Sequence, residues 1–211
     1  MPKATRSKQE VAKVREDILR CALTILEEDG FESCSMGKIG SRMKMTAANL
    51  YNYFSNKNQL FIGIHKNAFN RLYDQLSAAV KNEKTPLDMA RGFFKAYIDF
   101  AIGNPALYDV MLNRPVLQHS DYLGTPEEKL SIDEFQSSMK CMILAIDVFT
   151  NLISSQPDFK ETDIEFKIIE TWGKFHGLIS LYNSGTLKEI SKEPKELFDR
   201  IIETTFNSYE R

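Results

Sequence analysis

The sequence contains little cysteine, and its three cysteines lie far apart. Cys21, Cys34 and Cys141 form no C-x-x-C pair, and an odd, sparse set argues against a disulfide framework and fits a reducing compartment. No group of histidine, cysteine and acidic residues has zinc-ligand spacing, so we expect no metal and no cofactor. A small fold held together by disulfides or zinc is therefore not expected.

Long apolar runs are also missing. The first fifteen residues are polar and do not resemble a signal peptide. No uninterrupted run of about eighteen apolar residues is present, as a membrane-spanning helix would need. We therefore expect a soluble, cytoplasmic protein with no membrane partner.

Motifs that mark catalysis are absent as well. The chain has no nucleophile elbow, no phosphate-cradling glycine loop and no dinucleotide fingerprint. Catalytic pairs on helices can escape a motif search, but nothing in this sequence points to one. We expect no enzymatic activity and name no catalytic residue.

The charge is unevenly distributed along the chain. The net charge of the 211 residues is -2, yet residues 1–66 hold eleven Lys and Arg against seven Asp and Glu, or +4. The remaining residues hold sixteen against twenty-two, or -6. A basic amino-terminal segment on an acidic body suits a part that meets phosphates, although solvated helices are often mildly basic too.

Apolar residues recur at helical spacing nearly throughout, and no long stretch alternates with period two. The pattern predicts an all-α protein. A first helix is expected over residues 10–29, followed by Gly30 as a suitable left-handed cap. Pro86 marks a later break, and the proline- and glycine-containing stretch 115–130 is expected to be a loop.

Two short helices with good caps follow the first. Ser35 can cap a helix over residues 36–43, and Thr46 can cap another over 47–53. Asn56 with Gln59 resembles a capping box that opens a long helix. Two short helices separated by about three residues have helix-turn-helix spacing, in which the second helix enters the major groove. We therefore expect a three-helix DNA-binding domain at 1–60 and a larger helical bundle at 61–211, which binds an effector and dimerises.

The outward side chains of this segment are the candidate DNA contacts. Small residues at Thr46 and Ala47 allow close approach to base edges, and Asn49 can read adenine. Tyrosine hydroxyls and lysines can contact phosphates, which fixes register without reading sequence. An ordinary solvated role is the alternative for each, and for Lys38 both readings are equal. The predicted DNA-binding residues are Ser35, Lys38, Thr46, Ala47, Asn49, Tyr51, Asn52, Tyr53 and Lys57.

The run from Phe31 to Phe61 resembles the DNA-binding domain of the tetracycline-repressor (TetR, AcrR-like) family. The sharpest part is Asn49-Leu50-Tyr51-x-Tyr53-Phe54-x-x-Lys57-x-x-Leu60, and Asp29-Gly30-Phe31 matches the exit of the family's first helix. Gly40 stands where the family usually has alanine, which should loosen its helix by about 0.5–1 kcal/mol. Lys44 stands where glycine is usual, and a positive φ there would add strain of about 1 kcal/mol.

The carboxy-terminal part has a weaker resemblance. Trp172-Gly173-Lys174-Phe175-His176-Gly177-Leu178 is similar to the Trp…His-Gly signature of WHG-type regulator domains in this family. The resemblance implies that the last two long helices, about 163–184 and 195–207, form a four-helix dimer interface. The predicted interface residues are Phe175, Ile179, Tyr182, Leu197 and Ile201.

The resemblance also implies an effector pocket within the bundle. Adaptable thioethers and rings, with tyrosine hydroxyls for polarity, suit a partly apolar small molecule. Core packing is the alternative reading of this stripe, and its helical spacing taken alone favours core. The candidate pocket residues are Phe93, Tyr97, Phe100, Tyr108, Met111, Met139, Met142, Phe149, Trp172 and His176.

Together these features predict a ligand-responsive transcriptional repressor. It would bind a palindromic operator on double-stranded DNA as a homodimer and be released by a small-molecule effector. Two alternatives stay open: a ligand-binding or protein-interaction module of the same fold that does not read DNA, and a constitutive DNA-binding regulator without an effector.

Overall fold

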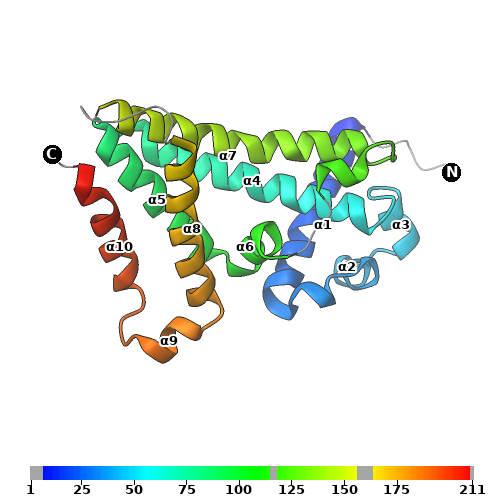
Figure 1. The fold of residues 1–211 in the computed structure, drawn as a ribbon. Helices are drawn as coiled ribbons and strands as arrows, with labels where there is room; N and C mark the ends of the chain where they lie inside the picture. The colour runs from blue at the N-terminus through cyan, green and yellow to red at the C-terminus, as the bar shows by residue number, and fades with distance from the viewer. Residues whose placement is uncertain (1–6, 115–117, 156–163, 210–211) are drawn as a thin grey trace. The chain divides into compact units, whose positions relative to one another are not determined.

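The computed structural model describes residues 7–114, 118–155 and 164–209, and this part of the chain contains helices and no strand (Figure 1). The all-α prediction is confirmed. The elements, in chain order, are α1 (Lys8–Asp29), η1 (Phe31–Ser33), α2 (Met36–Met43), α3 (Ala47–Tyr51), α4 (Lys57–Lys81), α5 (Pro86–Gly103), α6 (Pro105–Leu112), η2 (His119–Tyr122), α7 (Glu128–Ser154), α8 (Ile164–Asn183), α9 (Thr186–Ile190), α10 (Glu196–Phe206) and η4 (Asn207–Tyr209).

Polar caps fix where the helices begin. Ser7 and Glu10 form a reciprocal capping box at the start of α1, so this helix begins two residues before the predicted start. The Thr85 hydroxyl accepts a hydrogen bond from the Asp88 N–H, and Pro86 occupies the first turn of α5, where a missing N–H has no cost. Gly30 ends α1 with φ +80°, a conformation that favours glycine.

The chain divides into two compact units. Unit 1 combines residues 1–68 with 106–136, and unit 2 combines residues 69–105 with 137–211. The sequence analysis placed a single boundary near residue 60, whereas the contacts add 106–136 to the amino-terminal part. Two long helices, α4 and α7, each contribute residues to both units.

Each unit has its own core. In unit 1 the face of α1 that carries Ile18, Ala22 and Ile25 is fully buried, as the spacing of its apolar residues predicts. In unit 2 the ring of Phe94 on α5 contacts four other phenylalanine rings. Their centroids lie 4.5–5.8 Å away and belong to Phe93, Phe149, Phe175 and Phe206.

The stretch predicted as a loop is partly helical. The Asp121 carboxylate accepts a hydrogen bond from the Gln118 N–H at 2.7 Å and caps η2, and the Tyr122 side chain is buried. Residues 115–117 lie outside the described residues. The prediction of a loop is therefore wrong for residues 119–122, where a local cap and a buried ring outweigh the polar composition, and for residues 128–130, which open α7.

One described helix, α7, is long and apolar enough in composition to cross a membrane. The search for an uninterrupted apolar run missed this helix, because a few polar residues interrupt its apolar ones. Composition of this kind is also found in core helices of soluble proteins, so it is weak evidence for a membrane. Only 28 % of the most apolar stretch of α7 is buried in the protomer, which leaves an apolar surface on this helix.

Candidate nucleic-acid interface

The segment from Ser35 to Tyr53 folds as two short helices joined by a tight turn. The Ser35 hydroxyl accepts a hydrogen bond from the Lys38 N–H, and the Thr46 hydroxyl accepts one from the Asn49 N–H, each at 3.2 Å. Lys44 ends α2 in the left-handed conformation, with φ 55° and ψ 38°. The predicted caps at Ser35 and Thr46 are confirmed. Lys44 has the positive φ that was considered for it, and this conformation is strained for a lysine.

Gly40 lets α2 and α3 approach closely. A Cβ atom at this position would lie 2.8 Å from the Met45 carbonyl oxygen and 3.2 Å from Leu50 Cδ1. The Met45 N–H donates to the Gly40 carbonyl at 2.8 Å, so the turn folds directly over this residue. The expectation that glycine merely loosens α2 was incomplete, since the missing side chain makes room for the turn.

Arg15 of α1 braces the end of the recognition segment. Its guanidinium lies 4.2 Å from the centroid of the Phe54 ring and donates a hydrogen bond to the Tyr53 carbonyl oxygen. Burial lowers the pKa of Arg15 from its ordinary value. Sequence reasoning missed this residue. Its place one turn before the buried Ile18 was the available signal.

Most predicted DNA contacts share one exposed surface. The side chains of Thr46, Ala47, Tyr51 and Asn52 on α3 and its caps are exposed, and Tyr51 has 47 % of its surface free. Ser35 and Lys57 are also exposed, whereas Lys38 and Asn49 are half-buried. Eight of the nine predicted residues therefore retain solvent-accessible surface.

Tyr53 is the exception. Its side chain has only 7 % of its surface exposed and belongs to the core of unit 1. The predicted helix over 47–53 in fact ends at Tyr51, and the Tyr53 N–H donates to the Leu50 carbonyl, three residues back. This tighter turn points the ring inward. The prediction of a phosphate contact by Tyr53 is not supported by its position.

Three cations near this surface are already engaged within unit 1. Lys38 Nζ lies 3.1 Å from Asp29 Oδ2, and Arg42 pairs with Glu28 and with Asp29. The Lys57 ammonium lies over the Phe61 ring, 5.3 Å from its centroid. DNA phosphates would therefore compete with ion pairs that are half-exposed and weak in water.

The predicted effector residues lie mostly in the cores. Phe93, Tyr97, Phe100 and Phe149 in unit 2 have 5 % or less of their surface exposed, and Tyr108 and Met111 are buried in unit 1. This is the core reading that the sequence left open. Trp172 and Met142 are exposed, whereas Met139 and His176 are half-buried.

Three of these residues do come together in unit 2. Trp172 Nε1 donates to the Tyr97 hydroxyl at 2.9 Å, and the Trp172 and His176 rings lie 5.6 Å apart. Burial lowers the pKa of His176. An aromatic and polar group therefore lies where α5 meets α8, beside the core of unit 2.

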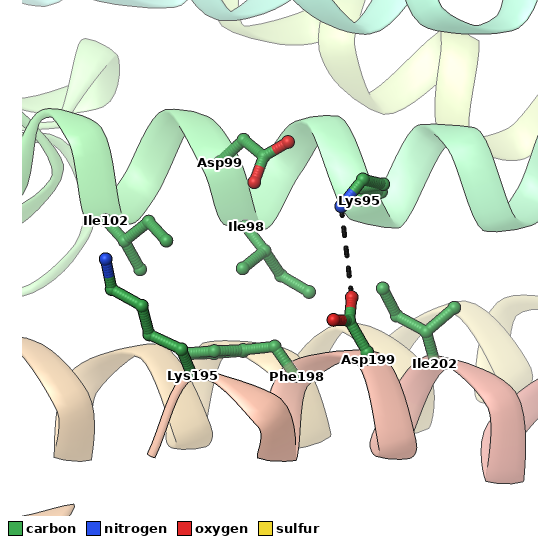
Figure 2. A pocket seen from close by; sticks show the side chains of 8 residues that line it. All are labelled: Lys95, Ile98, Asp99, Ile102, Lys195, Phe198, Asp199 and Ile202. Atoms are coloured by element: carbon green, nitrogen blue, oxygen red, sulfur yellow. Dashed lines mark ion pairs between the residues drawn. The ribbon is translucent and has the colours of Figure 1, made fainter. Parts of the chain in front are cut away.

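A groove of about 250 Å³ lies elsewhere in unit 2, between α5 and α10 (Figure 2). Isoleucines of α5 face Phe198 and Ile202 of α10 across it, and Lys95 pairs with Asp199 at 3.8 Å. None of the predicted pocket residues lines this groove. Its lining residues are Lys95, Ile98, Asp99, Ile102, Lys195, Phe198, Asp199 and Ile202.

Two predicted dimer residues lie inside the protomer. Phe175 and Ile179 have no exposed surface, because this face of α8 packs into the core of unit 2. Tyr182, Leu197 and Ile201 are half-buried. The large exposed apolar side chains of α8 are instead Phe166, Ile169, Trp172 and Leu181.

Family models match both parts of the chain. Residues 18–64 match the model of bacterial regulatory proteins of the tetR family, and residues 90–205 match the tetracyclin repressor-like C-terminal domain. The narrower resemblance to WHG-type domains stays a prediction.

Relatives in sequence and structure agree with these matches. YobS of Bacillus subtilis, an uncharacterized HTH-type transcriptional regulator, is 26 % identical over 161 residues, 70 % of this chain and 82 % of YobS. The nucleoid occlusion factor SlmA of Mannheimia succiniciproducens is 24 % identical over 52 % of this chain and 51 % of SlmA, so the chain spans about half the length of that relative. The structure of the transcriptional regulator FadR from Bacillus subtilis in complex with stearoyl-CoA shares the fold, with a TM-score of 0.68 and 14 % identity over 90 % of this chain and 97 % of FadR.

The carboxy-terminal model alone covers more than half of the chain, and the amino-terminal model covers the helix-turn-helix. The family consists of transcription factors, which agrees with the expectation of no enzymatic activity. This chain belongs to the tetracycline-repressor family of bacterial regulatory proteins.

Proposed function

We propose that the chain represses transcription by binding a palindromic DNA operator as a homodimer, and that a partly apolar small molecule releases it. The observation that carries the DNA-binding part is the exposed face of α3, with Thr46, Ala47, Tyr51 and Asn52 beside each other on a braced and capped helix. Such a protein acts in the cytoplasm, where the bacterial chromosome lies.

The exposed residues divide into two roles. Small side chains at Thr46 and Ala47 allow the helix to enter the major groove, where the amide of Asn49 reads adenine. Tyr51, Lys57 and the first turn of α2 at Ser35 contact phosphates and set the register. The N–H groups of that turn are suited to a phosphate oxygen.

Dimerisation rests on the uncovered apolar surface of unit 2. Phe166, Ile169 and Trp172 repeat every three residues along α8, and a Cβ at Gly173 or Gly177 would meet no atom within 4 Å. Met142, Ile143 and Ile146 form a second exposed row on α7. Apolar patches of this kind are typical of protein interfaces, and a second copy of the chain is the partner that a palindromic operator requires.

The effector proposal is supported by fold and composition. FadR, which shares this fold, is described in complex with stearoyl-CoA. Unit 2 of this chain is rich in aromatic side chains, which suit an apolar ligand. The protein has two conformations, one favoured by the effector and the other by DNA. Each ligand therefore lowers the affinity for the other by the same factor.

Selection from random DNA duplexes by the purified protein tests the DNA-binding part. At about 0.15 M salt, where non-specific phosphate attraction is reduced, we expect a palindrome to be enriched. Asn49→Ala and Tyr51→Phe should weaken binding to that palindrome without changing thermal melting. Asn58→Ala and Tyr73→Phe are matched controls outside α3 and should bind normally.

Either of two results would contradict this proposal. Absence of enrichment would favour a ligand-binding or interaction module that does not read DNA. Unchanged binding by both α3 variants would place recognition on another element. If a palindrome is enriched but no effector in a metabolite screen weakens binding, the constitutive regulator is the correct reading.

Sedimentation tests the dimer. Ile169→Asp places a charge on the exposed row of α8, where Ile169 has 56 % of its surface free, and should give folded monomers. Leu123→Asp changes an equally exposed apolar residue of unit 1, at 59 %, and should remain dimeric. A dimer that survives Ile169→Asp would place the interface elsewhere.

A further inference from the structure

Glu127 is a buried carboxylate in the unit that contains the helix-turn-helix. It precedes α7 by one residue, and its side chain has 7 % of its surface exposed. Residues 106–136 belong to the same compact unit as residues 1–68. A charged group is rarely buried without partners, because it loses its hydration.

The partners of Glu127 are the two amide side chains that open α4. Glu127 Oε1 accepts hydrogen bonds from Asn56 Nδ2 at 2.8 Å and from Gln59 Nε2 at 3.3 Å. The other ends of the same amides cap the helix. Asn56 Oδ1 accepts from the Gln59 N–H at 2.9 Å, and Gln59 Oε1 accepts from the Ser55 N–H at 3.1 Å.

The Glu127 carboxylate thus orients both amide side chains, Asn56 and Gln59, whose oxygens accept from backbone N–H groups. An amide side chain has an oxygen at one end and an N–H donor pair at the other. When Glu127 accepts from the donor ends, the oxygen of Asn56 faces the Gln59 N–H in the first turn of α4, and the oxygen of Gln59 faces the Ser55 N–H just before the helix. The amide of Asn56 lowers the pKa of Glu127, which keeps the acceptor ionised.

Glu127 is itself held on both sides. Its N–H donates to Thr125 Oγ1 at 3.3 Å, and its carbonyl accepts from the Ser131 N–H at 2.9 Å. Ser131 is 1 % exposed, and its hydroxyl lies 2.9 Å from His119 Nδ1. The carboxylate therefore belongs to a built turn and not to a loose surface loop.

The pairing continues along the same two helices. Lys66 Nζ lies 3.2 Å from Asp133 Oδ2, and His65 Nδ1 lies 3.8 Å from Glu134 Oε1. Acidic residues on the first turns of α7 thus face donors on α4. Among these pairs, that of Glu127 involves the α4 residues nearest to the recognition segment, Asn56 and Gln59.

The first turn of α4 connects directly to α3. Four residues separate Tyr51, the last of α3, from Asn56, and two of them, Tyr53 and Phe54, are buried. Such a short, packed connection transmits a shift of Asn56 to the recognition helix.

We propose that Glu127 is a positioning residue for DNA recognition, which holds the caps of α4 and thereby fixes the orientation of α3. This inference rests on the proposed DNA-binding function. Removing Glu127 should therefore lower the affinity for the palindrome, because base contacts are disturbed. Loss of a negative charge alone would instead raise the affinity for DNA of any sequence.

The first test compares Glu127→Ala with Glu128→Ala, measured on the palindrome selected by the wild-type protein and on a random duplex. Glu128 carries the same charge one residue away, and its carboxylate accepts from the Gly124 N–H. We expect Glu127→Ala to bind the palindrome roughly tenfold more weakly, with random-duplex binding unchanged or tighter. Glu128→Ala should keep the wild-type ratio of the two affinities.

The second test adds a charge and then compensates for it. Asn56→Asp keeps an efficient cap but places a carboxylate against Glu127. Asn58→Asp adds the same charge in the same turn at an exposed side chain. Asn56→Asp should lose roughly ten times more palindrome affinity than Asn58→Asp. Adding Glu127→Gln to Asn56→Asp should restore most of it, because the new amide donates to Asp, whereas adding Glu128→Gln should not.

The outcomes separate this inference from the proposed function. If the wild-type protein selects no palindrome, the function fails, and the inference with it. If it selects one and Glu127→Ala keeps the wild-type affinity ratio, only the positioning role is wrong. An unfolded fraction lowers both affinities equally and leaves their ratio unchanged, so the ratio decides even when a variant melts early. Equal rescue by Glu127→Gln and Glu128→Gln would also overturn the inference.

Discussion

Different kinds of contact stabilise the two compact units of this chain. Around the recognition segment of unit 1, polar and charged groups meet at defined distances, as in the pair of Lys38 with Asp29 and the amides that bind Glu127. In unit 2 the centre is a group of four phenylalanine rings around Phe94. Directional contacts fix orientation, whereas ring packing supplies stability.

This difference fits the roles that we propose for the two units. A recognition helix must keep its angle within narrow limits to read bases, and hydrogen bonds define angles. A bundle that dimerises and senses an apolar molecule needs a large buried surface that can repack. We therefore expect substitutions in the core of unit 2 to act mainly on stability, and substitutions of the exposed residues of α3 in unit 1 to act mainly on specificity.

The largest effect is expected for Phe94→Ala. This residue has 2 % of its surface exposed, and its loss leaves a cavity among the remaining rings. We expect the free energy of unfolding to fall by about 3–5 kcal/mol, measured by denaturant titration. Tyr51→Ala removes an exposed aromatic ring from unit 1 and should change stability little while weakening DNA binding. Equal stability losses in the two variants would remove the contrast between the units.

Gly40→Ala should also destabilise the protein. The added methyl group meets the Met45 carbonyl oxygen at 2.8 Å, which forces α2 and α3 apart. We expect a loss of about 1–3 kcal/mol in denaturant unfolding. Gly37→Ala on the same helix meets nothing within 4 Å and should instead stabilise by about 0.4–1 kcal/mol. A stabilising Gly40→Ala would show that the turn relaxes freely.

Lys44→Gly should have a smaller and opposite effect. The lysine has φ 55°, and glycine relieves about 1 kcal/mol of strain there. The greater freedom of glycine in the unfolded chain offsets about half of that, leaving a net gain of about 0.5 kcal/mol. Lys44→Ala retains the strain and should show no gain in melting temperature. A destabilised Lys44→Gly would mean that the lysine side chain itself holds the turn.

The smallest effect is expected from acidification. Burial lowers the pKa of His176 below its ordinary value of 6.5, so folding favours the neutral ring. The stability of this site is complete above pH 6.5 and decreases as the pH falls through the lowered folded-state pKa. His176→Gln should show a flatter stability profile below pH 6.5 in denaturant titrations. Parallel profiles for the two proteins would show that the ring has no such role.

Unit 1 responds to acid at a lower pH. The pKa of Glu127 lies below its ordinary value of 4.5, because Asn56 and Gln59 donate to the carboxylate. Its contribution is complete above pH 4.5 and decreases as the pH falls through the lowered folded-state value. Acidification from pH 6.5 to pH 4.5 therefore perturbs His176 while ionised Glu127 still holds the caps of α4.

Local signals in the sequence predicted most of the fold and part of the site. The hydroxyl caps at Ser35 and Thr46 and the buried stripe of α1 depend on neighbours close in sequence, and the structure has them as expected. The inward ring of Tyr53 could not be predicted, because it depends on a tightened turn that ends α3 two residues early. The same holds for Gly40, whose role is set by the Met45 carbonyl across a turn.

Longer-range contacts were harder to predict. The contact of Glu127 with Asn56 joins residues 71 positions apart, and no periodicity signals such a pair. Phe175 was expected at a dimer surface, but an apolar face on a helix does not reveal whether its own bundle or a partner covers it. The aromatic stripe of α5 was ambiguous for the same reason, and its rings lie in the core.

The shortness of α3 limits how much DNA sequence a single helix can read. Five residues span about 7.5 Å, or roughly two base-pair steps, so each protomer of the proposed dimer would read about three base pairs with this helix. Six fully read pairs recur by chance about once in 4,000 positions, which leaves some hundreds of matches in a genome on the order of 10⁶ positions. About four further base pairs of information must then come from residues that flank α3 and from the ease with which particular sequences bend.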